Sequence, residues 1–169
     1  MSQIAARRVF EEGHTRKFLV IADETPEVDA ALYFAACRCL HTGGMIKLLY
    51  VIQPQEFQHW MGVRDIQVQE ETTKAKALFR LFGRKLSNAG LADVAVDEEI
   101  REGSLVPEIL AAIDEDEDVA VLVLGAATGT KGPGPLVSSL AAGSAAGTFP
   151  IPITIVPGHL TLNVLKGMA

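Results

Sequence analysis

The sequence has few cysteines, few aromatic residues and no long run of apolar residues. Two of its 169 residues are cysteine, and Phe, Trp and Tyr together make up 6%. Cys37 and Cys39 are separated by one residue. On a helix, side chains at this spacing point in different directions, so they are poorly placed to share a metal or to form a disulfide. We therefore expect two buried thiols in a reducing compartment.

The lack of long apolar segments excludes a membrane-spanning helix. No run approaches the roughly 20 apolar residues that cross a bilayer. The first residues, MSQIAARRVFEEGHTRK, contain no apolar stretch followed by a cleavage site, so they do not form a secretory signal. These absences predict a cytoplasmic protein that does not contact a membrane.

Basic residues are also in short supply. Lys and Arg number 15 against 21 Asp and Glu, which gives a formal net charge of -6. A nucleic-acid-binding face needs a basic stripe, so we expect no nucleic-acid partner. A small anion held by backbone N–H groups stays possible, because those groups carry no net charge.

Motifs for hydrolytic chemistry are absent as well. The sequence shows no nucleophile elbow, no Ser-His-Asp order and no metal-ligand spacing. His14, His59 and His159 fall in irregular segments, with no acid or cysteine at a useful distance along the chain. We expect no catalytic residues and no metal, and at most a slow nucleotide hydrolase.

Five short apolar segments alternate with helical patterns along the chain. Helices of ten or more residues between strands imply parallel pairing with right-handed crossovers. The pattern predicts an α/β fold: an open, doubly wound, five-stranded parallel sheet with helices on both faces, of the Rossmann-like type. The expected strands cover residues 17–22, 45–52, 94–100, 119–125 and 151–157.

The composition suits one domain with a single core, because 49% of the residues are hydrophobic. We expect a poorly ordered lead-in at residues 1–16, the α/β domain at 17–157 and a tail at 158–169. In the long central helix, an apolar stripe of Ala75, Leu78, Phe82 and Leu86 marks the face toward the core.

The loop GAATGTKGPG, residues 125–134, follows the most apolar of the expected strands. Its glycines permit close approach of a ligand to the backbone, and hydroxyl and amine groups beside them could bind phosphate oxygens. Doubly wound sheets bind ligands beyond the carboxyl ends of strands where the strand order reverses. The alternative is a structural loop, since neither standard phosphate-binding glycine motif is present. The phosphate hypothesis involves Gly125, Thr128, Gly129, Thr130, Lys131, Gly132, Gly134, Ser138 and Ser139.

Two acidic features allow two interpretations each. Asp23 ends the first strand, where it could contact a ribose or an adenine amino group, or could accept backbone N–H groups at the next helix. The run DEDED, Asp114 to Asp118, lies at the opposite end of the sheet. It could bind a metal or a basic partner, and we interpret it as a solvated turn. Phe57 to Trp60 precede the long helix and form either a flap or a packed loop.

Four segments together resemble the universal stress protein family over about residues 17–157. FLVIADETPEVDAAL, GGMIKLLYVIQP and IREGSLVPEIL are similar to its first, second and third strands with the turns and helices beside them. VAVLVLGAATG, followed later by IPITIV, is similar to its fourth and fifth strands.

The resemblance implies this fold, with the first and fourth strands adjacent, and a homodimer through the last strand. Some members bind ATP through a motif G-x2-G-x9-G-[ST], and others lack it. Here Gly125 and Gly129 have three intervening residues, not two. Residues matching the ligand end of the family would be Ala22, Asp23, Val51, Leu124 and Gly125.

Three functions follow as hypotheses. The first is a stress-response protein that binds an adenine nucleotide, ATP or AMP, with the Mg²⁺ requirement open. The second is a nucleotide-independent dimer that recruits a protein partner, and the third is the slow hydrolase. We expect the dimer to use Ile151, Ile153 and Ile155, because a β-branched apolar strand at a sheet edge favours pairing. If the glycine loop binds phosphate, Gly→Val at Gly125 or Gly132 should abolish binding and leave the fold intact.

Overall fold

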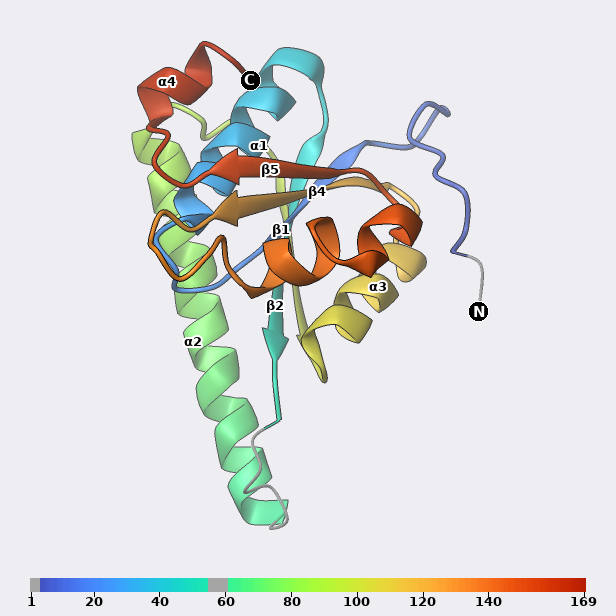
Figure 1. The fold of residues 1–169 in the computed structure, drawn as a ribbon, viewed down its shortest axis with the longest axis vertical. Coiled ribbons are helices and arrows are strands. Elements are labelled where there is room, and N and C mark those ends of the chain that lie inside the picture. Colours follow the sequence, from blue (N-terminus) through green and yellow to red (C-terminus); the bar gives the residue numbers. More distant parts are fainter. Residues whose placement is uncertain (1–3, 55–60) are drawn as a thin grey trace.

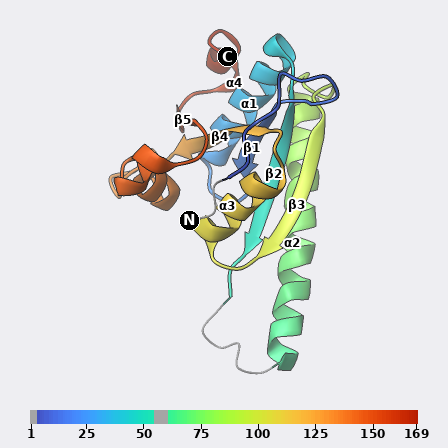
Figure 2. The same cartoon turned by 90° about the vertical axis from the view of Figure 1, so that its right-hand side faces the viewer.

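The chain forms one five-stranded sheet with helices on both faces (Figures 1 and 2). The computed structural model describes residues 4–54 and 61–169, so Phe57 to Trp60 lie outside the described part. The strands are β1 (Lys17–Ile21), β2 (Met45–Ile52), β3 (Val96–Glu102), β4 (Val119–Ala126) and β5 (Ile153–Pro157). The helices are α1 (Val28–Thr42), α2 (Met61–Asn88), α3 (Leu105–Glu115) and α4 (Leu162–Lys166), with short helical turns η1 (Val137–Ala141) and η2 (Ser144–Thr148).

The strand order is β3-β2-β1-β4-β5, and every pairing is parallel. The predicted doubly wound sheet is therefore confirmed, and so is the adjacency of β1 and β4. Because the strand order reverses between β1 and β4, the segments that follow them go to opposite faces of the sheet and leave a crevice at the carboxyl ends of these strands.

Two apolar layers cover the sheet. Alternate residues of β1 face opposite sides: Phe18 and Val20 pack with α1 and α2, while Leu19 and Ile21 pack with α3 and η1. The predicted stripe on α2 is buried as expected at Ala75, Leu78, Phe82 and Leu86. Figure 2 shows α3 on the face of the sheet opposite α1 and α2.

The bounds of β3 and β5 differ from the prediction by two residues, and β1 and β4 each end one residue away from the predicted position. β3 covers Val96–Glu102 instead of 94–100, because much of its ladder is built from charged residues that an apolar pattern does not reveal. β5 begins at Ile153, not at Ile151. Ile151 is buried within its own chain, with 5% of its surface exposed, so it is not part of the edge strand.

The interpretation of the acidic run as a solvated turn is wrong for Asp116. Its Oδ2 atom accepts hydrogen bonds from the Nζ atoms of Lys17 at 2.7 Å and Lys47 at 2.9 Å, and only 17% of its side chain is exposed. Burial alone would raise the pKa of Asp116, but these two ammonium groups outweigh it and hold the pKa below its usual value. Asp114 in the same run is exposed, as expected.

The N-terminal segment contacts the amino end of the sheet. Arg7 donates from its Nη1 atom to the carbonyl oxygens of Ile113, Asp116 and Val119, at 2.7, 2.9 and 3.2 Å. These bonds satisfy carbonyls at and after the end of α3. The expected poor order of residues 1–16 stays a prediction.

Candidate functional site

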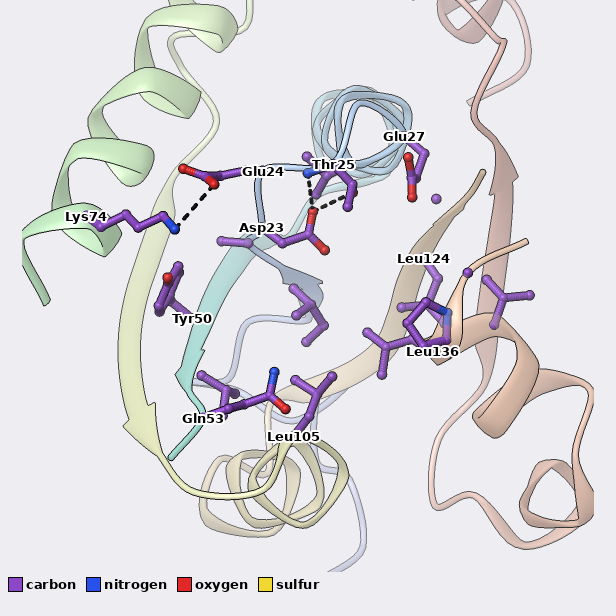
Figure 3. Close-up of a pocket in the computed structure, with 18 of the residues that line it drawn as sticks. Asp23, Glu24, Thr25, Glu27, Tyr50, Gln53, Lys74, Leu105, Leu124 and Leu136 are labelled. Atoms are coloured by element: carbon purple, nitrogen blue, oxygen red, sulfur yellow. Dashed lines mark hydrogen bonds and ion pairs between the residues drawn. The ribbon is translucent and has the colours of Figure 1, made fainter. Parts of the chain in front are cut away.

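A cleft of about 610 Å³ lies at the carboxyl ends of β1, β2 and β4. This volume is in the range of small-molecule sites. Ile21, Ala22, Val51 and Leu124 give it apolar walls, and Leu136 closes one side. Figure 3 shows Leu124 and Leu136 on one side of the cleft, and Glu24 and Lys74 on the other.

Asp23 stands at the exit of β1 and faces this cleft. Its Oδ1 atom accepts hydrogen bonds from the backbone N–H of Thr25, at 2.8 Å, and from the Thr25 hydroxyl. The structure thus shows Asp23 accepting the backbone N–H at the start of the turn, and Figure 3 shows its carboxylate between the two sides of the cleft. Burial raises the pKa of Asp23, and the nearby Glu27 and Glu24 carboxylates raise it further, against the effect of the Thr25 bonds.

The long helix α2 supplies a polar wall that sequence reasoning missed. Gln67, Glu71 and Lys74 line the cleft from positions i, i+4 and i+7, which share one face of a helix. The Tyr50 hydroxyl donates to Glu71 Oε2 at 2.6 Å, and burial together with this bond raises the pKa of Tyr50. Lys74 Nζ lies 3.3 Å from Glu24 Oε2. The i, i+4, i+7 pattern was visible in the sequence, but a solvated helix face has the same pattern.

Gln67 contributes a buried polar atom to this wall. The Oε1 atom of Gln67 is buried and accepts no hydrogen bond from the residues that the structure describes. An unsatisfied buried acceptor is costly, so this position favours a ligand or water that donates. The same described residues contain no group of three or more His, Cys, Asp and Glu side chains placed to hold a metal ion.

Gly125 closes the corner between β4 and the start of α1. A Cβ atom at this position would overlap the backbone carbonyl oxygen of Glu27. A Cβ atom on Gly158 would likewise overlap the carbonyl oxygen of Ala126. The expectation that a larger side chain at Gly125 leaves the fold intact is therefore wrong, because the glycine is needed for backbone packing.

A scan of protein-family models matches the universal stress protein family over residues 14–157. The chain belongs to this family. The resemblance that the sequence analysis described is thereby confirmed, and the family match covers all five strands.

Solved structures of universal stress proteins share the fold. UspA from Lactobacillus plantarum is similar at 18% identity and a TM-score of 0.58, covering 86% of this chain and 99% of that one. A universal stress protein in complex with cAMP is similar at 15% identity and a TM-score of 0.54, covering 86% and 99%. A family protein from Arabidopsis thaliana with AMP bound is similar at 17% identity and 0.54, covering 84% and 91%. A search of the curated proteins found no match.

In this universal stress protein, the structure brings only part of the predicted site together. Ala22, Asp23, Val51, Leu124, Gly125 and Gly134 line the cleft. The remaining candidates are exposed and lie outside its lining, and their role as phosphate ligands stays a prediction. They are Thr128, Gly129, Thr130, Lys131, Gly132, Ser138 and Ser139.

The glycine loop of this universal stress protein folds as a tight turn. The backbone N–H of Ala127 donates to the carbonyl of Pro133 at 3.0 Å and closes the loop on itself. Gly132 and Gly134 have φ values of +95° and +105°, a region that favours glycine. Ser139 donates its hydroxyl to the carbonyl of Pro135 at 2.6 Å. The backbone conformation of the loop therefore favours glycine at positions 132 and 134.

Proposed function

We propose that the chain is a cytoplasmic stress-response protein that binds an adenine nucleotide, ATP or AMP, in the cleft at the carboxyl ends of β1 and β4. The observation that carries this proposal is the cleft itself: about 610 Å³ at the point of strand reversal, with the Asp23 carboxylate facing it. Two proteins of the same fold were crystallised with cAMP and with AMP, which supports the choice of ligand class.

The lining suits the adenosine part of such a ligand. Val51, Leu124 and Ala22 offer apolar surface to an adenine ring. Asp23 and Gln53 offer polar groups to ribose hydroxyls or to the adenine amino group. In the described residues, no helix is long and apolar enough to cross a membrane.

The first test is to identify what the purified protein carries. Mass spectrometry of the supernatant released by heat should detect an adenine nucleotide. Calorimetric titration with ATP, AMP and adenosine, with and without Mg²⁺, should then measure its affinity. Asp23→Ala should weaken every adenosine-containing ligand by about 1.5–3 kcal/mol, the range for hydrogen bonds to a charged group. Asp114→Ala is the control, since Asp114 is exposed at the amino end of the sheet. Binding of none of the three ligands at millimolar concentration rejects the proposal.

A second candidate function is recruitment of a protein partner by a homodimer. β5 is the last strand in the sheet order, and Ile155 on it is 43% exposed. A groove of about 480 Å³ beside this edge is lined by Ala141, Ala146, Phe149, Ile155 and residues 150–153. An unpaired edge strand with apolar surface favours association with a second copy. If the cleft binds no nucleotide, recruitment of a protein partner becomes the preferred function.

A further inference from the structure

The cleft carries far more negative than positive charge. Among the described residues that line it, four carry a carboxylate and one carries an ammonium group. They are Asp23, Glu24, Glu27 and Glu71, and Lys74. The single cation is already paired, because Lys74 Nζ lies 3.3 Å from Glu24 Oε2. A polyanionic ligand entering this cleft would meet net repulsion, which is strengthened where water is excluded.

Negative charge also lies at the corner of the cleft where the phosphates of a nucleotide are expected. Glu27 lies beside Gly125, the first glycine of the loop, and Figure 3 shows its carboxylate on the Leu124 side of the cleft. Some of the backbone donors nearby are missing or already used. Pro133 and Pro135 have no N–H, and the N–H groups of Ala127 and Ser138 donate to Pro133 and Gly134. Lys131, the basic residue of the loop, is exposed and does not line the cleft.

The described lining also presents many hydrogen-bond acceptors. Carboxylate oxygens accept hydrogen bonds and donate none at neutral pH, and the buried Oε1 atom of Gln67 is an acceptor without a partner in the described residues. Phosphate oxygens are acceptors too, so they do not satisfy these groups. Ribose hydroxyls and an adenine amino group are donors, so they do.

We infer that this cleft takes an adenine nucleoside carrying at most one phosphate, and that each added phosphate weakens binding. The inference rests on the proposed function and narrows it: the nucleoside part supplies the affinity, and the acidic wall selects against the triphosphate.

The test is a calorimetric series with adenosine, AMP and ATP on the full chain without divalent cations. Adenosine should bind at least as tightly as AMP, and ATP should bind about tenfold or more weakly than adenosine. Because salt screens repulsion as well as attraction, ATP binding should strengthen between 50 and 300 mM NaCl while adenosine binding stays constant. A phosphate cradle would show the opposite salt dependence.

A variant that removes one negative charge tests which side chain disfavours the triphosphate. Glu27→Gln should improve ATP affinity about threefold or more and leave adenosine affinity within twofold. Asp114→Asn removes the same charge from the far end of the sheet and should change neither. Circular dichroism establishes that each variant is folded before it is titrated.

The outcomes separate the two proposals. Binding of ATP more tightly than adenosine, or ATP binding that weakens with salt, overturns this inference and leaves the proposed function standing. An unchanged ratio of ATP to adenosine affinity in folded Glu27→Gln also overturns it. Failure of all three ligands to bind overturns the proposed function, and this inference with it.

Discussion

At Gly125 the backbone of β4 lies against the backbone at the start of α1, with no side chain between them. In the sequence this glycine looked like the first element of a phosphate-binding motif. Its packing role depends on Glu27, which is distant along the chain, so no local pattern could reveal it. Asp23 is similar: its position at the end of an apolar strand was predictable, but the environment that raises its pKa comes from tertiary packing.

Gly125→Ala should destabilise the fold by about 3 kcal/mol, because the new methyl group overlaps the Glu27 carbonyl and the backbone must shift. Urea unfolding followed by circular dichroism measures the change. Gly129→Ala is the matched control: it lies in the same loop, has no atom within 4 Å of an added Cβ, and should cost less than about 0.5 kcal/mol. Equal stabilities of the two variants would show that the backbone at Gly125 can shift at little cost in free energy.

Asp23→Asn should make the protein more stable at pH 7. The raised pKa means that the folded state favours the protonated carboxyl. This contribution to stability is full below the pKa of the unfolded chain, about 3.9, and is lost as the pH rises through the folded pKa. Asparagine stays neutral and keeps an oxygen for the Thr25 bonds.

Thermal unfolding of both proteins between pH 4 and 7.5 measures the difference, which should grow with pH. Asp114→Asn, at an exposed carboxylate, should show no such trend. A lower stability of Asp23→Asn at every pH would mean that charge-assisted bonds to Thr25 outweigh desolvation.

Among the strands, those with a continuous apolar sequence were predicted most accurately. β4 has a continuous apolar sequence and was placed to within one residue, while β3, with the sequence VDEEIRE, was shifted by two residues. Most of its charged side chains form ion pairs, which an apolar pattern does not reveal. Lys47 Nζ lies 3.0 Å from Glu99 Oε2, and Arg101 donates to Glu99 and to Glu115 of α3. These ion pairs join β2, β3 and α3 where an apolar contact would be usual.

Asp116→Asn tests the ion pairs that Asp116 forms with Lys17 and Lys47 at the amino end of the sheet. The variant should lose about 1.5–3 kcal/mol at pH 7, because Asp116 accepts bonds from two ammonium groups. The lowered pKa of Asp116 means that its contribution is present above the unfolded pKa and is lost as the pH falls through the folded value.

Denaturant unfolding should therefore show the gap between wild type and Asp116→Asn closing on acidification. Asp114→Asn, two residues away and exposed, should stay within about 0.5 kcal/mol of wild type. If both variants behave alike, the run is a solvated turn after all.

At the scale of the whole molecule, the sheet order puts the cleft near its centre and β5 at its edge. The parallel sheet followed from the alternation of strands and helices, and the adjacency of β1 and β4 from the family resemblance; the full strand order was not predicted. The wall contributed by α2 was not predicted either, because it requires knowing which face of a 28-residue helix turns toward the end of β2. Tyr50 and Glu71 meet across 21 residues of sequence, and the contact is set by how α2 crosses the sheet.

The exposed edge leads to a prediction about assembly. Wild type should scatter light as a dimer, at about twice the 18.1 kDa of one chain. Ile155→Lys should give a monomer, because a charge on an edge strand opposes pairing. Ile66→Lys is the control, since Ile66 near the start of α2 is also exposed, at 58%, and Figure 1 shows that end of α2 far from β5. A wild-type monomer at micromolar concentration would reject the dimer.

Two close backbone approaches, of Gly125 to Glu27 and of Gly158 to Ala126, make one wall of the cleft stiff. Where main chain meets main chain, no rotamer change can absorb a displacement, so the start of α1 and the ends of β4 and β5 shift together or not at all. The opposite wall is compliant, because α2 reaches the cleft through the long side chains of Gln67, Glu71 and Lys74. A bound molecule therefore has to match the contour at Gly125 closely, while differences in its size are accommodated on the α2 side.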